Sequence, residues 1–265
     1  MKPTNTLFGA GLFLVALFVV ACGSAPSDGE ADRGSEMASD MQYTLTPFTP
    51  SAAYPDASID GYRFENGTYN FEISNYELGI QTPDADSKMC ANSGQGQHIH
   101  LIIDNQPYSA QYTANFDYDI ANGEHYMLAF LSRSYHESVK NPAARVADRI
   151  VVEDGTISAR QPIDEPVLFY SRPKGTYVGE AETSKVMLDF YVLNTELSPN
   201  MQVKADINGE IHMIDTWQPY YIEGLPMGEN TITLTLVDGD GVAVDAPLNP
   251  VTRTFTLQAD PAEQM

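Results

Sequence analysis

The sequence contains very little cysteine and little positive charge. Its two cysteines are Cys22 and Cys90. Cys22 lies in a targeting segment, so Cys90 has no partner and no internal disulfide framework is expected. Only 14 lysines and arginines stand against 36 aspartates and glutamates, which gives a formal net charge of −22. Proteins that bind nucleic acid carry basic patches, so this acidic composition argues against a nucleic-acid partner.

A long hydrophobic run is also missing. The apolar stretch at residues 7–20 is shorter than the about 20 residues that cross a bilayer, and it is typical of a secretory signal. Val19-Val20-Ala21-Cys22 resembles a bacterial lipobox, which implies that residues 1–21 are a lipoprotein signal peptide and that Cys22 is lipidated. An ordinary signal peptide is the alternative. We therefore expect a protein attached by lipid to the membrane of the bacterial cell envelope, in the outer membrane, facing the periplasm or the surface.

Apolar side chains are almost absent from residues 22–42, which are rich in serine, glycine and acidic residues. Such a segment cannot bury enough apolar surface to order itself. It predicts a flexible tether whose reach is on the order of 25 Å. Residues 260–265 are expected to form a tail.

An internal repeat divides the rest of the chain. His98–Asn105 (HIHLIIDN) aligns with Gln202–Gly209 (QVKADING), and Gln-Pro-Tyr follows both, at residues 106–108 and 218–220. Each copy consists of short runs of alternating polar and apolar residues separated by turn residues. This pattern predicts an all-β protein with two tandem immunoglobulin-like antiparallel β-sandwiches. We place them at residues 43–159 and 175–259, joined by a linker at residues 160–174.

The first repeat resembles a bacterial envelope family of unknown function. In that family a histidine-rich strand ending in Asp is followed by Pro-Gly-x-His and a further histidine. The matching residues here are His98, His100, Asp104, Gly123, His125 and His136, with Asn122-Gly123 in place of Pro-Gly. The resemblance implies a fold and a place to look for a site, but no activity.

Strand phase predicts where the two neighbouring histidines point. In the second copy the apolar residues of 203–207 alternate with polar ones, so they face the core. The same phase in the first copy puts Ile99 inside and places His98 and His100 on the outer face, as surface groups. His125 lies at the far end of the neighbouring strand, with inward phase, and is expected to be a hydrogen-bonded structural histidine.

The same outer face is apolar in the first copy only. It carries Ile102, Tyr126, Leu128 and Phe130, where the second copy has threonines in the strand at 231–235. A contiguous apolar surface is usually covered or used. Either the linker or the second domain covers it, or it binds a partner such as an envelope protein or a glycan. Our first hypothesis is a non-catalytic ligand-binding or interaction module that uses this face.

Five side chains with metal-binding atoms are expected to converge at one end of the first sandwich. They are Met89, Cys90, His98, His100 and His136. Imidazole, thiolate and thioether donors suit Cu(I) or Zn(II), and the second copy has no matching side chains. A lipoprotein that binds Cu or Zn, with no other cofactor expected, is therefore the alternative function. Solvated histidines on a polar rim would also explain the pattern.

No catalytic motif is found. A GxSxG sequence is absent, and His136-Glu137 does not continue to HExxH because Lys140 occupies the last position. We therefore predict that the protein is not an enzyme. Ser171-Arg172-Pro173-Lys174-Gly175 is a local basic spot in an acidic chain. It marks the domain junction or takes an anionic ligand.

Overall fold

The computed structural model describes residues 42–261. The predicted signal peptide, the lipidated Cys22 and the tether up to residue 41 lie outside this range, as do residues 262–265 of the tail. Within it the chain is nearly all β, and the one α-helix, α1 (Glu180–Thr183), has four residues. No helix in residues 42–261 has the length and apolar character needed to cross a membrane.

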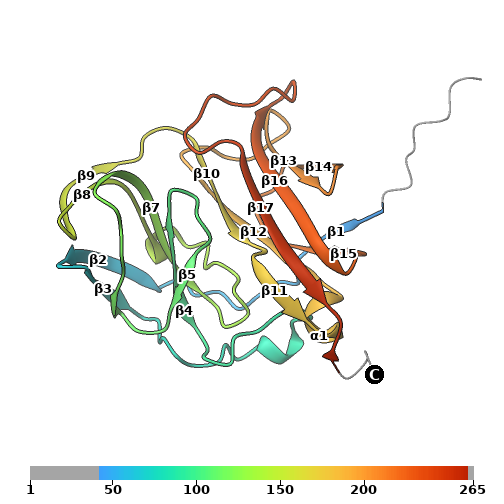
Figure 1. Cartoon of the computed structure of the whole chain (residues 1–265), viewed down its shortest axis with the longest axis horizontal. Helices are drawn as coiled ribbons and strands as arrows, with labels where there is room; N and C mark the ends of the chain where they lie inside the picture. Colours follow the sequence, from blue (N-terminus) through green and yellow to red (C-terminus); the bar gives the residue numbers. More distant parts are fainter. Residues whose placement is uncertain (1–41, 262–265) are drawn as a thin grey trace, which may run out of the picture. The chain divides into compact units, whose positions relative to one another are not determined.

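The first sandwich consists of a three-stranded and a five-stranded sheet, in the strand orders β2-β3-β6 and β5-β4-β7-β8-β9 (Figure 1). The three-stranded sheet contains β2 (Ser58–Glu65), β3 (Thr68–Ser74) and β6 (Asn115–Asp117). The five-stranded sheet contains β4 (His98–Ile103), β5 (Ser109–Gln111), β7 (Gly123–Ser132), β8 (Arg145–Glu153) and β9 (Thr156–Pro162). Their facing sides enclose one hydrophobic core, which includes Tyr69, Ile99 and Met127.

The second sandwich pairs a four-stranded with a five-stranded sheet, in the orders β1-β15-β12-β10 and β11-β17-β16-β13-β14. The first of these contains β1 (Thr44–Pro47), β10 (Val167–Arg172), β12 (Val186–Leu193) and β15 (Tyr220–Glu223). The second contains β11 (Gly175–Val178), β13 (Met201–Ile207), β14 (Glu210–Ile214), β16 (Gly228–Asp238) and β17 (Val251–Gln258). The predicted fold class, two immunoglobulin-like β-sandwiches, is confirmed.

Equivalent strands of the two copies pair in equivalent register. His100 of β4 lies opposite Phe130 of β7, and Lys204 of β13 lies opposite Thr235 of β16. The repeat therefore has a structural meaning, because the same two strands form the centre of each five-stranded sheet.

The two sandwiches stack on each other through a third hydrophobic cluster. Phe130 and Ile102, on the outer face of the first sandwich, pack with Phe169 of β10 and Tyr191 of β12. Four sheets thus lie in layers, and strands β4, β10 and β12 of the two inner sheets are covered on both sides. Every residue of β4, β10 and β12 is buried, so these strands lack the regular alternation of polar and apolar residues that a half-exposed strand shows.

The predicted domain boundaries differ from the structure at both ends of the first sandwich. Residues 44–47 form β1, which pairs with β15 of the second sandwich. Most of the predicted linker at 160–174 is strand, because β9 extends to Pro162 and β10 begins at Val167. The run VLFY of β10 is buried on both faces, between the core of the second sandwich and the junction. A stretch this apolar is stable as an inner strand and not as a solvated linker.

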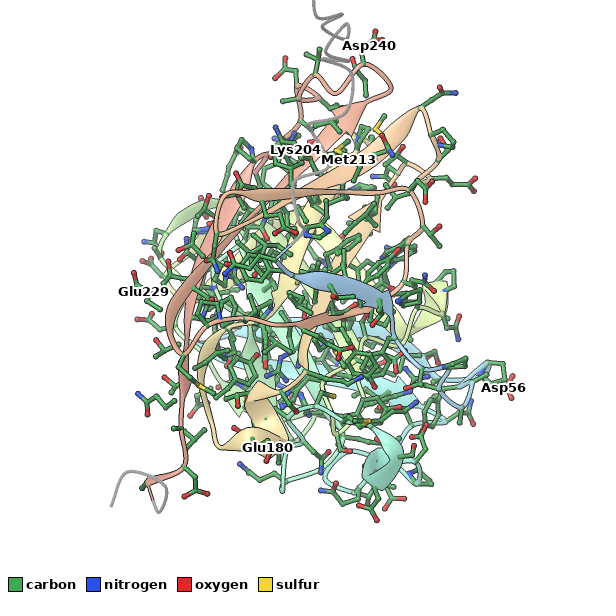
Figure 2. The ribbon with its side chains drawn as sticks, turned by 90° about the vertical axis from the view of Figure 1, so that its right-hand side faces the viewer. Asp56, Glu180, Lys204, Met213, Glu229 and Asp240 are labelled. Atoms are coloured by element: carbon green, nitrogen blue, oxygen red, sulfur yellow. The ribbon has the colours of Figure 1, made fainter. Side chains whose placement is uncertain are left out.

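Acidic side chains dominate the exterior. Asp56, Glu180, Glu229 and Asp240 are exposed and point away from the sheets (Figure 2). The exposed acidic side chains contribute to the negative charge of the surface, while the layered interior is mainly apolar and also contains polar and charged side chains such as Arg172 and Asp189.

Candidate functional site

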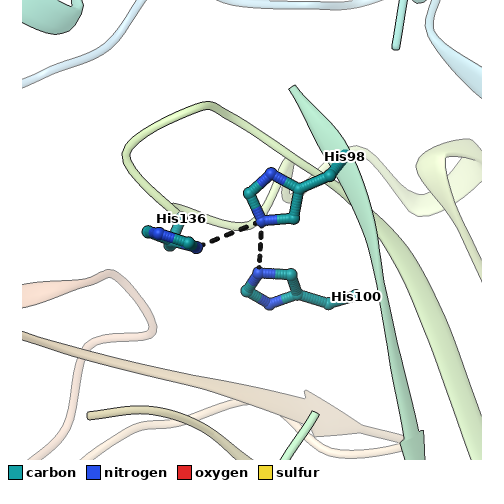
Figure 3. Close-up of side chains that lie close together, drawn as sticks. All are labelled: His98, His100 and His136. Atoms are coloured by element: carbon teal, nitrogen blue, oxygen red, sulfur yellow. Dashed lines mark hydrogen bonds between the residues drawn. The ribbon is translucent and has the colours of Figure 1, made fainter. Parts of the chain in front are cut away.

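Three histidines meet at the edge of the junction between the sandwiches (Figure 3). His98 and His100 project from the outer face of β4, and His136 lies in the turn that follows β7. His98 is paired with Ser132 at the end of β7, which brings the turn beside it. Their nearest ring nitrogens, one from each residue, all lie within 4.8 Å of one another.

The turn after β7 has a backbone conformation that aims His136 at the strand. The N–H of Arg133 donates to the carbonyl of Glu137 (2.9 Å), and that of His136 donates to the carbonyl of Arg133 (2.8 Å). His136 has φ +71°, in the left-handed region that few residues other than glycine adopt. Backbone strain of this kind collects at functional sites.

The predicted strand phase is correct, but the conclusion drawn from it about solvent is wrong. His98 and His100 do lie on the face opposite the sandwich core, yet both are fully buried. The four-stranded sheet of the second sandwich covers that face, and the hydroxyl of Ser171 in β10 lies 3.2 Å from His100 Nδ1. The alternation of side chains along a strand identifies the face on which each residue lies, but it does not identify what packs against that face.

The candidate partner face is covered in the same way. Ile102, Leu128 and Phe130 have no exposed surface, and Tyr126 is partly buried at the edge. Tyr126 also donates a hydrogen bond to Glu165 (2.9 Å), in the segment that links the sandwiches. Of the two alternatives left open by the sequence, coverage by the second domain is therefore correct, and this face is not available to a partner.

Hydrogen bonds indicate which nitrogens of the cluster carry protons. His98 Nδ1 lies 2.8 Å from the carbonyl oxygen of Gly96. A carbonyl only accepts, so Nδ1 carries the proton of the neutral ring and Nε2 has a lone pair. That lone pair faces His100 Nε2 at 2.8 Å and His136 Nδ1 at 3.1 Å. One lone pair thus faces two ring nitrogens, and the same three nitrogens could together ligate one cation.

Two of the three separations between these nitrogens are close to those of a metal site, and the third is within 4.8 Å. A tetrahedral zinc ion with Zn–N bonds of about 2.0–2.1 Å separates its nitrogen ligands by roughly 3.3 Å. The 2.8 and 3.1 Å separations differ from this by a few tenths of an ångström. Gly96 and Ser171 hold the outer nitrogens of His98 and His100, which is the usual way that ligand histidines are oriented.

Burial keeps the three rings uncharged. It lowers the pKa of His98 to about 4 and that of His100 and His136 well below the ordinary value; the nearby charges of Arg172 and Lys174 act in the same direction. Neutral imidazole is the form that binds metal ions. The site therefore stays ready for a metal at pH values where an exposed histidine would be protonated.

Aromatic rings form the walls of the site. Tyr108 stacks on His100 with ring centroids 3.6 Å apart and an interplanar angle of 11°. Its hydroxyl lies 3.3 Å from His136 Nδ1. Tyr112 lies beside His98, with centroids 5.0 Å apart. Sequence analysis did not assign Tyr108 or Ser171 to the site; the repeated Gln-Pro-Tyr and the basic spot at 171–175 were the available signals.

The two sulfur ligands predicted from sequence do not join the histidines. Cys90 is buried in a separate cluster with Phe48, Tyr135 and Tyr221, and burial raises the pKa of its thiol to about 12. Met89 is 59% exposed, whereas His98 and His100 are fully buried. The prediction for these two residues is wrong because the loop before β4 folds toward β1 and β15 instead of over the strand end.

His125 lies apart from the cluster, as the strand phase predicts. Its Nδ1 is 2.6 Å from a carboxylate oxygen of Asp104, and its Nε2 is 2.9 Å from the carbonyl of Ala121. Both ring nitrogens are occupied within the protein. His125 is a structural histidine that ties the start of β7 to the end of β4.

No family model matches the chain, and no curated protein matches it. Among solved structures it is similar to fibronectin(III)-like modules of Clostridium thermocellum CbhA, with 16% identity and a TM-score of 0.27 over 36% of this chain and 99% of that one. A second similarity is to the extracellular domain of a putative hybrid two-component system from B. thetaiotaomicron, with 11% identity, a TM-score of 0.26, and coverage of 74% and 38%. A third is to a Ca²⁺-stabilized adhesin with which an Antarctic bacterium binds ice, with 12% identity, a TM-score of 0.22, and coverage of 82% and 48%. The chain thus spans less than half the length of the last two proteins, and similarities this weak carry no argument about function.

Proposed function

We propose that this protein binds a transition-metal ion, Zn(II) or Cu(I), through His98 Nε2, His100 Nε2 and His136 Nδ1. The observation that carries the proposal is the convergence within 4.8 Å of these three nitrogens, from the buried His98 and His100 and the partly buried His136. The lone pair of His98 Nε2 faces both other nitrogens, at 2.8 and 3.1 Å, so the three donor atoms point toward one another. A metal ion would satisfy all three at once.

The donor set narrows the choice of ion. Three imidazoles without carboxylate or thiolate suit Zn, Cu, Ni and Fe, and they are unlike the oxygen ligands of Ca²⁺ or Mg²⁺. Among residues 42–261, this is the only group of three histidine, cysteine or acidic side chains that meets the geometric requirement for a metal site. Because Cys90 is remote, the soft sulfur donors that would favour Cu(I) alone are missing, so both ions belong in the test.

The role we propose is metal binding or handling by a non-catalytic envelope protein. The support for attachment is the lipobox at Val19–Cys22, which would tether the folded part to a membrane of the bacterial envelope. Cys22 lipidation is tested separately, by radiolabelled palmitate incorporation with a Cys22→Ala control. Loss of the label in that variant is the expected result.

Calorimetric titration of the reduced protein with Zn(II) and, anaerobically, with Cu(I) tests the site. We expect one ion per chain, bound at submicromolar concentration. His98→Ala and His100→Ala should abolish the binding, and circular dichroism should verify their fold. His136→Asn is the gentler variant, because asparagine tolerates a positive φ. It should weaken binding at least tenfold.

His125→Asn is the matched control, since this histidine is hydrogen bonded away from the cluster. It should bind the metal like the unaltered protein. No saturable binding of either ion, or binding that is indifferent to all three cluster variants, would contradict the proposal.

A further inference from the structure

The surroundings of the histidine cluster are positively charged, which is unexpected for a cation site in a protein of net charge −22. Arg172 and Lys174 follow Ser171, the residue bonded to His100, and neither forms an ion pair with a carboxylate among the residues of known structure. Arg172 is buried, and its guanidinium donates to the hydroxyl of Tyr177, at 3.2 Å from Nε and 2.7 Å from Nη2.

Lys174 is positioned against the wall of the site. Its Nζ lies 4.1 Å from the centre of the Tyr108 ring, which stacks on His100 and whose hydroxyl approaches His136. Burial, followed by the charges of Arg172 and Arg253, lowers the pKa of the Lys174 ammonium. The Arg253 guanidinium donates to the backbone carbonyls of Tyr170 and Asn105.

Buried cations are normally paired with acidic groups, because an uncompensated charge in the interior is costly. Among residues 42–261, no acidic side chain is paired with the buried Arg172 or with the partly buried Lys174. The two positive charges beside the histidine cluster are therefore not balanced by a nearby carboxylate of the described residues. An external anion can supply the compensating negative charge.

The metal site itself also lacks a ligand. Only three of the described histidine, cysteine and acidic side chains meet there, and a zinc site with three protein ligands keeps its fourth position for a water or another exogenous group. The Tyr108 hydroxyl lies 3.3 Å from His136 Nδ1, but a phenol is not among the usual zinc ligands.

We propose that the metal held by His98, His100 and His136 takes a small monovalent anion as its remaining ligand, with Lys174 and Arg172 supplying the compensating charge. This inference rests on the proposed metal site. Metal and anion then bind cooperatively. The positive side chains of Lys174 and Arg172 repel a metal ion that binds without the anion, and the bound anion neutralises this repulsion. By linkage, the anion raises the affinity for metal by the same factor as the metal raises the affinity for the anion.

The test compares the Zn(II) affinity of the protein in sodium azide and in sodium perchlorate at equal ionic strength. Azide coordinates metal ions and perchlorate hardly does, while both screen charge equally. We expect azide to raise the Zn(II) affinity tenfold or more, within the usual range of about 5–150-fold for coupled sites. Co(II) in place of Zn(II) gives a second readout, because azide coordination changes its visible absorption bands.

Lys174→Met separates the charge from the packing, since methionine keeps an unbranched apolar chain against Tyr108. In perchlorate this variant should bind Zn(II) more tightly than the unaltered protein, because a repelling charge is gone. Its gain in affinity from azide should shrink at least threefold. Lys204→Met is the matched control, because Lys204 lies on β13, at the outer part of the second sandwich (Figure 2). Its replacement should leave unchanged both the Zn(II) affinity in perchlorate and the gain in affinity caused by azide.

Zn(II) binding that is equal in the two salts, or an azide effect unaltered by Lys174→Met, would overturn this inference and leave the proposed metal site intact. Failure to bind metal in either salt would instead defeat the proposed function, and the anion site with it.

Discussion

Acid should destabilise the metal-free protein through the buried histidines, and His98 gives the clearest case. Burial lowers its pKa from the ordinary 6.5 to about 4. The unfolded chain therefore takes up a proton on this ring at a higher pH than the folded protein does. Stability from keeping the ring neutral is fully present above about pH 6.5 and is lost as the pH falls toward about 4.

The size of the effect follows from the two pKa values. At pH 5 an ordinary histidine of the unfolded chain is almost fully protonated, while folded His98 is still mostly neutral. Proton linkage for this residue alone then removes about 2 kcal/mol of unfolding free energy between pH 7 and pH 5. The pKa values of His100 and His136 are lowered as well, so they act in the same direction.

Urea denaturation in the presence of a chelator, at pH 7 and at pH 5, measures this loss. The single tryptophan, Trp217, is a suitable probe because it packs against both the second core and the junction cluster. His98→Gln removes the titrating group, and the variant should lose about 2 kcal/mol less than the unaltered protein between the two pH values. The raised pKa of Glu137 has the opposite effect on stability, but it is common to both proteins and cancels in the comparison.

An equal loss in His98→Gln and in the unaltered protein would refute the reasoning, because the fold would then not be holding this ring neutral. Saturating Zn(II) at pH 7 should add stability to the unaltered protein and none to the variant.

Two further predictions concern the junction and the thiol. Phe130→Ala should destabilise the protein by about 3–5 kcal/mol in urea denaturation, since this ring is fully buried between the sandwiches. Met213→Ala, at a 45% exposed position labelled in Figure 2, should change stability by less than about 0.5 kcal/mol; similar losses in both variants would contradict the buried junction. In a Cys22→Ser variant, Cys90 should react with a disulfide reagent at pH 8 only after unfolding, because its thiol is buried and has a pKa of about 12. Rapid labelling of the native protein would show instead that Cys90 is accessible.

Local pattern was sufficient for the predictions that depend on neighbouring residues alone. The alternation in residues 202–207 carries the phase of β13, and the aligned repeat transfers that phase to β4, where Ile99 faces the core as expected. The antiparallel partner of β4 and the proximity of His98 to Ser132 follow from the same repeat. The separation of His125 from the other histidines also follows from the antiparallel direction of the two strands and from their length.

The pattern within one strand does not determine what packs against the outer face of a sheet. Each five-stranded sheet has an outer side, and only the first is covered by the other sandwich. The sequence indicated that this face is covered, because Tyr126, Leu128 and Phe130 stand where the second copy has threonines. However, an apolar face can pack against a partner protein as well as against a second domain. Only the tertiary structure distinguishes them.

By itself, the sequence determined the all-β class, the repeat, and the strand phase that places His98 and His100 side by side. Tertiary structure alone decided that these rings are buried and neutral, that Ser171, Tyr108 and Lys174 surround them, and that Cys90 does not join them. The physical reason is the distance along the sequence between the residues that determine each property. Alternation records the two faces of one strand, whereas burial, pKa and the convergence of ligand atoms depend on segments more than 35 residues apart, such as β4 and His136, or 71 residues apart, such as His100 and Ser171.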